Sequence, residues 1–319
     1  MLTKMGKIMN EFLNTIMVGD VREQLKRLPD NSIDCVVTSP PYWGLRDYGN
    51  EGQIGLEESP EEFVANLVEV FNEVKRVLAD DGTLWLNLGD SYASDTKGSG
   101  GKTAKQITNA GSFHTSKKLN HGLKSKDLVG IPWRVAFALQ ADGWYLRQDI
   151  IWAKPNPMPE SVKDRCTRSH EYIFLLTKQP RYYYDHEAIK EPLANPKRTN
   201  FRPGKRAYAE GNTEQIPGER TRRNDGFEKY ANGATFTNKN KRSVWHVATK
   251  PFKGAHFAVY PPKLIEPCIL AGCPEGGVVL DPFFGSGTTG VVAKEHNRNY
   301  VGIELNPEYA KLAQDRLGI

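Results

Sequence analysis

The sequence has no apolar run long enough to cross a bilayer, and its first residues lack the charged-then-apolar form of a signal peptide. Cysteine is scarce, because only Cys35, Cys166, Cys268 and Cys273 occur among 319 residues. They are too scattered for a pair of zinc-binding motifs, so we expect reduced thiols and no metal. No internal repeat is visible. We therefore expect a globular protein of the cytoplasm, with no membrane partner.

Positive charge is concentrated in two segments. The net charge is +5, but residues 187–250 carry 14 Lys and Arg against 7 Asp and Glu, and residues 94–127 carry 7 against 2. The rest of the chain is therefore net acidic. Two basic segments on an acidic scaffold indicate a surface that binds a polyanion. Both segments are poor in aliphatic residues, so we interpret 94–127 as a flexible basic loop and 187–243 as an insert on the main domain.

Hydrophobic periodicity predicts alternating strands and helices outside those segments. An amphipathic helix is clearest at 60–78, and two strands near 145–177 have no helical pattern between them. The whole pattern predicts an α/β fold with a doubly wound, mostly parallel sheet of about seven strands and an antiparallel hairpin at one edge. The expected strands are 15–19, 33–38, 83–88, 145–152, 171–177, 277–281 and 300–304.

A stiff turn follows the buried strand at 33–38. It reads Ser39-Pro40-Pro41-Tyr42, and neither proline has an N–H to continue a ladder. The carboxyl end of a parallel strand is where α/β folds bind ligands. The turn presents a hydroxyl, free carbonyls and an aromatic ring, which suit a planar group that bears an amine. A rigid turn without a ligand is the structural alternative.

A second motif lies near the C-terminus, where a strand, a glycine turn and a helix start succeed one another. Gly285, Gly287 and Gly290 fit G-x-G-x-x-G, and Glu304 ends the next strand. This pattern favours a nucleotide, and taken alone it suggests a nicotinamide-dependent dehydrogenase. However, the chain ends one βα unit later, so the N-terminal strands must complete the sheet. Asp281-Pro282-Phe283 before the glycines also favours a ligand with ribose and adenine but no pyrophosphate.

These two motifs, in this order, resemble those of the S-adenosylmethionine-dependent DNA amino-methyltransferases, and specifically the circularly permuted beta class. The resemblance covers nearly the whole chain outside the basic insert. It implies a Rossmann-like methyltransferase fold, a catalytic domain formed by 1–186 and 244–319, and a target-recognition insert at 187–243. The implied cofactor is S-adenosyl-L-methionine, and the implied partner is double-stranded DNA with its target base flipped out.

The resemblance also implies roles for individual residues. Ser39 and the Pro40 carbonyl would accept hydrogen bonds from the exocyclic amine of the base, on which Tyr42 would stack, with Pro41 completing the tetrad. The segment 256–263 is similar to the one that lines the methionine end of the cofactor, and 151–157 is similar to one near the target pocket. The residues expected to bind the cofactor are Asp20, Phe257, Asp281, Phe283, Gly285, Gly287, Thr288 and Glu304. Those expected to contact DNA are Trp43, Arg46, Lys154, Arg202, Arg222 and Arg223.

Several alternatives stay open at this point. Asp20 can simply cap a helix, Trp43 can pack in the core, and Pro267-Cys268 is expected to be core although it imitates a cytosine-C5 nucleophile. A tetrad that begins with serine favours cytosine-N4 as the target, and adenine-N6 is the alternative. A DNA-binding module without catalysis is a further, weaker hypothesis. A homodimer and a cognate restriction endonuclease are possible partners that the sequence does not reveal.

Overall fold

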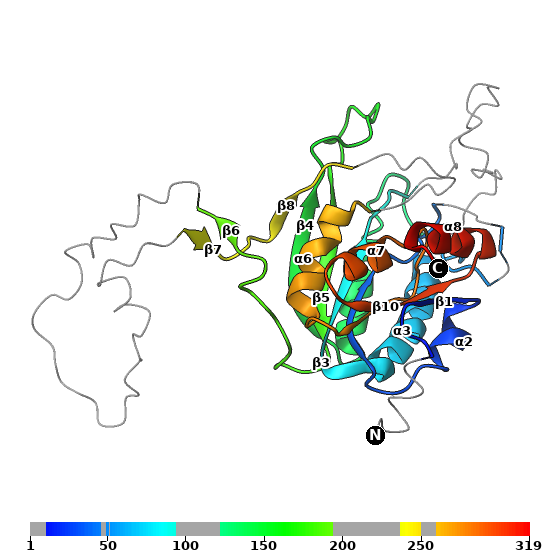
Figure 1. The fold of residues 1–319 in the computed structure, drawn as a ribbon. Helices are drawn as coiled ribbons and strands as arrows, with labels where there is room; N and C mark the ends of the chain where they lie inside the picture. Colours follow the sequence, from blue (N-terminus) through cyan, green and yellow to red (C-terminus); the bar gives the residue numbers. More distant parts are fainter. Residues whose placement is uncertain (1–10, 46–48, 51, 94–121, 194–236, 250–259) are drawn as a thin grey trace, which may run out of the picture. The chain divides into compact units, whose positions relative to one another are not determined.

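The computed structural model describes residues 11–45, 49–50, 52–93, 122–193, 237–249 and 260–319 (Figure 1). The chain divides into two compact units, Met1–Ala188 with Arg242–Ile319 and, separately, Ile189–Lys241. Among the described residues, the first unit carries an eight-stranded sheet in the order β1-β10-β9-β2-β3-β5-β4-β8. Its strands are β1 (Thr15–Val18), β2 (Ile33–Thr38), β3 (Leu78–Leu88), β4 (Tyr145–Ala153), β5 (His170–Thr177), β8 (Val244–His246), β9 (Val278–Asp281) and β10 (Asn299–Glu304).

Strands from the two ends of the chain are interleaved in this sheet. β1 pairs in parallel with β10, where Thr15 lies opposite Val301, and β2 pairs in parallel with β9, where Cys35 lies opposite Val279. The C-terminal strands β9 and β10 therefore lie between the N-terminal strands β1 and β2 (Figure 1). This confirms the expectation that the N-terminal strands complete the sheet that carries the glycine loop.

The antiparallel hairpin of β4 and β5 is also confirmed, but the strand count was one too low. β5 runs antiparallel to both β3 and β4, and the additional strand β8 pairs in parallel with β4 beyond the hairpin. The hairpin is therefore not the edge of the sheet. β8 is only three residues long and lies in a polar context, so it has no periodicity of its own. Pairing with Ile151–Ala153 of β4 makes it a strand.

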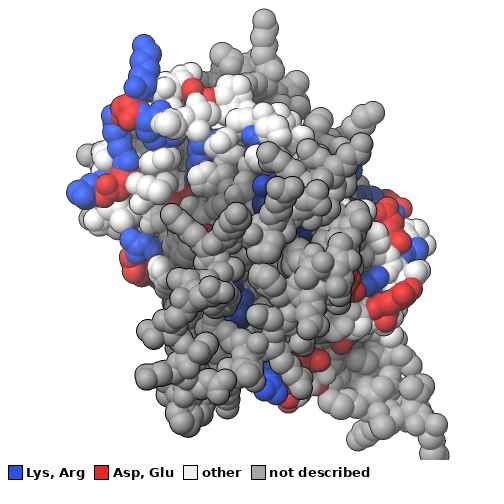
Figure 2. Space-filling view, turned by 90° about the vertical axis from the view of Figure 1, so that its left-hand side faces the viewer, with Lys and Arg blue, Asp and Glu red and all other residues white. Residues whose placement is uncertain are grey.

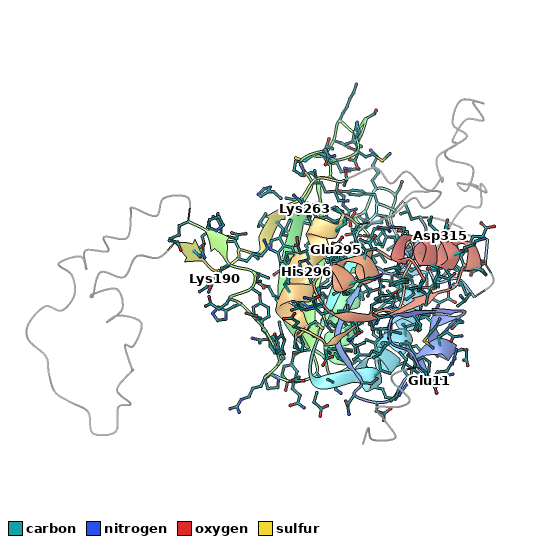
Figure 3. The ribbon with its side chains drawn as sticks, in the orientation of Figure 1. Glu11, Lys190, Lys263, Glu295, His296 and Asp315 are labelled. Atoms are coloured by element: carbon teal, nitrogen blue, oxygen red, sulfur yellow. The ribbon has the colours of Figure 1, made fainter. Side chains whose placement is uncertain are left out.

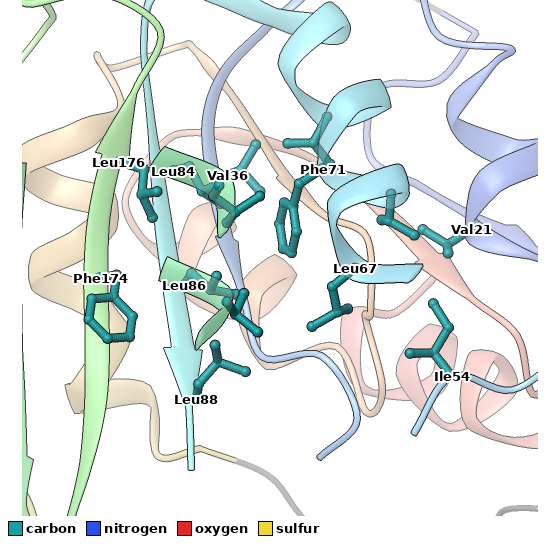
Figure 4. Close-up of a cluster of buried hydrophobic side chains, with 14 of the residues drawn as sticks. Val21, Val36, Ile54, Leu67, Phe71, Leu84, Leu86, Leu88, Phe174 and Leu176 are labelled. Atoms are coloured by element: carbon teal, nitrogen blue, oxygen red, sulfur yellow. The ribbon is translucent and has the colours of Figure 1, made fainter. Parts of the chain in front are cut away.

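Helices cover both faces of the sheet, as a doubly wound fold requires. On one face, Phe63, Leu67 and Phe71 of α3 pack in the same buried cluster as Val36 of β2 and Leu84 of β3 (Figure 4). α3 begins at Pro60 after the Ser59 cap, whose hydroxyl accepts from the Glu62 N–H at 3.2 Å. The helices are α2 (Val21–Leu25), α3 (Pro60–Val77), α4 (Ile131–Ala141), α6 (Pro262–Gly272), α7 (Thr288–Glu295) and α8 (Pro307–Leu317).

The opposite face of the strands packs against α6. Side chains alternate along β3, so Thr83 and Trp85 point away from the α3 cluster, and a Cβ on Gly272 of α6 would lie 2.5 Å or less from each of them. Cys268 of α6 is 1% exposed, which confirms that it is a core residue. Glu266 Oε1 of α6 lies 3.1 Å from Nε2 of His296, the residue that follows α7. His296 is labelled in Figure 3.

The described part of the second unit is a short antiparallel pair, β6 (Glu191–Pro192) with β7 (Asn238–Lys239). Glu191 lies 3.2 Å from Lys241 and 4.0 Å from Lys239, so an acidic residue partly neutralises two of the insert's cations. Most of the predicted basic loop, 94–121, falls outside the described residues. Among those that are described, no helix is both long and apolar enough to span a bilayer, and no cluster of His, Cys, Asp and Glu is placed to hold a metal ion.

Candidate active site

The two motifs meet at the carboxyl edge of the sheet. Ser39 follows β2, the glycine loop follows β9, and Glu304 ends β10, on strands that are neighbours or next neighbours in the sheet. Because β5 runs antiparallel to β3, its first residues, His170 and Glu171, lie at this same edge. The strand order thus brings together residues that are as many as 265 positions apart in the chain.

The glycine loop has a backbone conformation that side chains disfavour. Gly285 has φ 52° and Gly287 has φ 79°, both in the left-handed region. A Cβ on Gly287 would also lie 2.9 Å from the Ala313 Cβ of α8. The Gly285 N–H donates to Glu304 Oε2 at 2.7 Å, so the loop is tied to the end of β10. The glycines therefore serve both the turn and the close packing of α7 on α8.

The Glu304 carboxylate is oriented by backbone groups. Besides Gly285, the Asn306 N–H donates to its other oxygen, Oε1, at 2.8 Å. Burial raises the pKa of Glu304, and the N–H groups of Asn306 and Gly285 oppose this rise. A fixed carboxylate beside a glycine loop is a suitable acceptor for ribose hydroxyls. The residues present here therefore fit an adenosine-bearing cofactor, as the sequence predicted.

Asp281, which the sequence assigns to the cofactor, is surrounded by donors of the protein itself. Its side chain is 1% exposed, and its Oδ1 accepts from Thr38 Oγ1 at 2.7 Å and from the Phe283 N–H at 3.0 Å. Its Oδ2 accepts from Thr289 Oγ1 at 2.6 Å and from the Tyr260 hydroxyl at 2.9 Å. Four protein donors surround a carboxylate that the solvent does not reach. Asp281 therefore joins β9 to Thr38 of β2, the residue before Ser39, and its contact with a cofactor stays a prediction.

Three further predicted cofactor residues have protein partners. Thr288 is 3% exposed, and its hydroxyl accepts from Arg316 Nη1 of α8 at 3.2 Å, so it faces the protein. The side chain of Phe283 is partly buried against the core. Asp20 caps α2: its Oδ1 accepts from the Arg22 N–H at 2.8 Å, and its Oδ2 pairs with Arg22 Nη2 at 2.8 Å. The hydrogen bond from Arg22 lowers the pKa of Asp20, and contact with adenine stays a prediction.

The Ser-Pro-Pro-Tyr tetrad is held mainly through Tyr42. The Tyr42 hydroxyl donates to Glu171 Oε2 at 2.7 Å, and the Ser39 hydroxyl lies 3.5 Å from the Tyr42 oxygen. Gly89, after β3, lies against the ring, because a Cβ there would be 2.5 Å from Tyr42 Cε2. Burial, and next the Glu171 charge, raise the pKa of Tyr42 well above its usual value, so the phenol stays protonated.

The sequence did not indicate two polar residues that contact the tetrad. Glu171 is the second residue of β5, and its Oε1 forms an ion pair with Lys154. The Lys154 ammonium lies 4.2 Å from the centre of the Trp152 ring. Asn87 of β3 lies 3.4 Å from the Tyr42 hydroxyl through its Oδ1. Glu171 lies at the carboxyl edge of the sheet only because of the register in which β5 pairs with β3 and β4. Predicting its place near Tyr42 would therefore require a correct prediction of that register.

Of the predicted DNA contacts, Lys154 and Trp43 lie in described parts of the chain. Lys154 is 18% exposed beside Glu171. Trp43 is 7% exposed, and its indole N–H donates to the Glu57 carbonyl at 3.0 Å. The Trp43 ring therefore packs in the core, which was the alternative expectation, and its contact with DNA stays a prediction. The other predicted DNA contacts lie outside the described residues: Arg46, Arg202, Arg222 and Arg223. The predicted cofactor residue Phe257 also lies outside them.

The fold and the edge site define a class of protein: a doubly wound α/β enzyme whose glycine loop and acid-tipped strand suit a nucleoside-bearing cofactor. Residues 33–315 match a family model described as DNA methylase, of the N6/N4 type. The chain is 52% identical over 303 residues to the Type II methyltransferase M.Cfr9I of Citrobacter freundii, covering 95% of this chain and 87% of that one. It is 51% identical over 302 residues to M.SmaI of Serratia marcescens, covering 95% and 90%.

Solved structures share the fold. The PvuII DNA methyltransferase, described as cytosine-N4-specific, superposes with a TM-score of 0.61 at 20% identity, covering 94% of this chain and 85% of that one. M1.HpyAVI in complex with S-adenosylmethionine superposes with a TM-score of 0.54 at 18% identity, covering 96% and 98%. The chain belongs to the N6/N4 DNA methylase family. It is a DNA methyltransferase of the Type II kind.

Proposed function

We propose that this enzyme methylates the exocyclic N4 amine of cytosine at specific sites in double-stranded DNA, with S-adenosyl-L-methionine as donor. When bound, S-adenosyl-L-methionine would supply a methyl group on a cationic sulfur: the carbon–sulfur bond breaks to leave a neutral thioether, the amine nitrogen gains the methyl group, and its surplus proton passes to water. The chain's own residues hold the donor, orient the amine and exclude water. The same fold also suits adenine, and the serine at the start of the tetrad favours cytosine.

The observation that carries the proposal is the hydrogen bond from Thr38 Oγ1 to Asp281 Oδ1, at 2.7 Å. It joins the strand that ends in Ser39 to the strand that ends in the glycine loop. A hydroxyl that can accept from an amine is thereby fixed on the strand next to the loop that suits the cofactor. In this arrangement Ser39 Oγ and the Pro40 carbonyl accept hydrogen bonds from the two N–H groups of the amine. Tyr42 and Pro41 contact the base.

The cofactor residues follow the same geometry. Glu304 accepts from ribose hydroxyls, Gly285 and Gly287 let the backbone approach the donor, and Phe283 lies beside them. Asp20 at the end of β1 is assigned to adenine and Phe257 to the methionine end. Thr288 and Asp281 support the loop from within the protein.

Recognition of DNA is assigned to the basic segments. The described Lys, Arg, Asp and Glu side chains are of mixed sign on the face in Figure 2, so they form no uniformly basic surface there. The cationic surplus lies in 94–127 and in the insert 187–243, which we assign to target recognition. Arg46, Arg202, Arg222 and Arg223 are expected to contact DNA, together with Lys154. The Type II relatives support a restriction endonuclease as a cognate partner in the cytoplasm; a homodimer is a further possibility for assembly.

A thermal-shift comparison combined with a transfer assay tests the activity. S-adenosyl-L-methionine is expected to raise the melting temperature, NAD to leave it unchanged, and a labelled methyl group to appear on DNA. Stabilisation by NAD without transfer would identify a dehydrogenase. DNA binding without any transfer would identify a module that has lost catalysis.

A further inference from the structure

Five polar side chains form a cluster around the tetrad. Ser39 and Tyr42 follow β2, and Asn87 lies near the end of β3. Glu171 is the second residue of β5, and Lys154 follows β4. The side chains of Glu171 and Lys154 are 14% and 18% exposed, and Asn87 is 4% exposed. Such shielded groups must satisfy one another. Which of them donates and which accepts therefore decides what Ser39 can offer to a substrate.

The hydrogen bonds between Ser39, Tyr42 and Glu171 form a chain in which each hydroxyl donates toward Glu171. The Tyr42 hydroxyl has a single proton, and its nearer acceptor is Glu171 Oε2 at 2.7 Å, compared with Asn87 Oδ1 at 3.4 Å. A carboxylate accepts only, so Tyr42 donates to it and the phenol oxygen is left as an acceptor. Ser39 Oγ lies 3.5 Å from that oxygen, at the outer limit of a hydrogen bond, and it is the donor there. With its proton turned toward Tyr42, Ser39 Oγ keeps its lone pairs for an incoming N–H.

Glu171 is fixed by its own neighbours. Lys154 forms an ion pair with Oε1, and Asn87 Nδ2 lies 3.4 Å from Oε2 while it donates to the Tyr172 carbonyl at 3.0 Å. The Tyr172 carbonyl is part of the backbone of β5 and is held in place by the strand. The hydrogen bond to it fixes the orientation of the Asn87 amide, with Oδ1 toward Tyr42. Gly89 limits the movement of the Tyr42 ring. The carboxylate and the phenol therefore keep one mutual orientation.

We propose that Glu171 is a positioning residue for methyl transfer: through Tyr42 it orients the Ser39 hydroxyl so that Oγ accepts from the target amine. This rests on the proposed function. Its mechanism differs from that of a general base, since no proton leaves Tyr42 or reaches Glu171 during the reaction. An amide at position 171 has an NH2 donor in place of one of the two oxygens that now accept from Tyr42 and Lys154, so one of these two donors would face another donor.

A double-mutant cycle with the full-length enzyme tests this inference. Glu171→Gln is expected to lower kcat by about 10- to 100-fold, with KM for DNA and for S-adenosyl-L-methionine nearly unchanged, because only the orientation of the reacting amine is affected. Tyr42→Phe is expected to cause a similar loss. The double variant should be no slower than Tyr42→Phe alone, since Glu171 acts through the phenol.

Glu160→Gln is the matched control. It lies in the connection between β4 and β5, before Glu171 in the chain, and its carboxylate pairs with Arg165 at 2.7 Å. It should keep kcat within about two-fold of the wild type, as expected for a surface ion pair. Melting temperatures show whether each variant is folded, and Glu171→Asp replaces Glu171→Gln in the cycle if the amide prevents folding.

Three outcomes would overturn the inference. They are an unchanged kcat in a folded Glu171 variant, an unchanged kcat in Tyr42→Phe, and losses that multiply in the double variant. A wild-type enzyme that transfers no methyl group to DNA would instead contradict the proposed function, and this inference with it.

Discussion

At the scale of single residues, Ser39 is assigned a role in the reaction and Asp281 a role in stabilising the fold around the site. Ser39 is assigned the contact with the amine, whereas Asp281 is buried behind it and holds two strands together. Ser39→Ala removes an acceptor without touching the glycine loop. We expect kcat to fall at least about 100-fold, as it does when one oriented hydrogen-bonding group is removed from an active site. Cofactor affinity, measured by calorimetry, should be nearly unchanged, and turnover equal to the wild type would refute the assigned role.

Asp281→Asn is expected to act mainly on stability. The amide presents N–H donors where the hydroxyls of Tyr260 and Thr289 now donate. The mismatch in a buried site should lower the free energy of unfolding by about 1–3 kcal/mol, measured by denaturant titration. An unchanged unfolding midpoint would mean that the four hydrogen bonds do not support the fold.

The same variant should change the pH dependence of stability. Burial raises the pKa of Asp281 above 3.8, despite opposing hydrogen bonds from Thr289, Thr38, Phe283 and Tyr260. A carboxyl with a raised folded-state pKa adds stability below its unfolded pKa, and this stability is lost as the pH rises through the folded value. The advantage of the wild type over Asp281→Asn should therefore shrink as the pH rises from about 4 toward neutrality. A pH-independent difference would contradict this assignment.

At the scale of secondary-structure elements, the glycine loop depends on how Phe284 packs under β10. A Cβ on Gly302 would lie 2.4–2.6 Å from the inner atoms of the Phe284 ring, which stacks on Tyr300. Gly302→Ala must therefore displace the residue that precedes Gly285. We expect a loss of about 1–3 kcal/mol in stability, as for overpacked cores, together with weaker cofactor binding.

Gly318→Ala is the control for that prediction. Gly318 ends α8 with φ 70°, and a Cβ on it would meet no heavy atom of the described residues within 4 Å. The substitution should cost about 1 kcal/mol of backbone strain and leave cofactor affinity unchanged. Equal effects of the two substitutions on cofactor binding would show that Phe284 does not support the loop.

Some of these elements could be predicted from the sequence and others could not. The β-branched run before Ser39, the amphipathic spacing of α3 and the glycine turn are local signals, and each predicted its element. β8 could not be predicted, because three residues in a polar context become a strand only by pairing with β4. For the same reason Glu171 and Asn87 were missed: the register of β5 on β3 brings them to Tyr42. Asp281 was assigned to the cofactor because a motif shows its position but not its burial.

At the scale of the whole molecule, the basic segments of the sequence are distinct from the acidic catalytic scaffold, and we propose that these segments bind DNA. Arg202, Arg222 and Arg223 lie in the basic insert, and replacing all three by alanine should weaken DNA binding while leaving cofactor affinity unchanged. The slope of log K against log salt should become shallower by about 0.9 for each phosphate that the variant no longer neutralises. Binding measured from low to moderate salt gives both quantities. An unchanged slope would show that these arginines do not contact phosphates.

The central claim concerns one bond, between a transferred methyl group and the N4 nitrogen of cytosine. Expression of the full chain in a host that lacks DNA methylation, followed by sequencing that reports modified bases, gives the base and the site together. We predict N4-methylcytosine at one recurring sequence, absent when Ser39→Ala is expressed instead. N6-methyladenine at that sequence, or DNA without any new methylated base, would contradict the account.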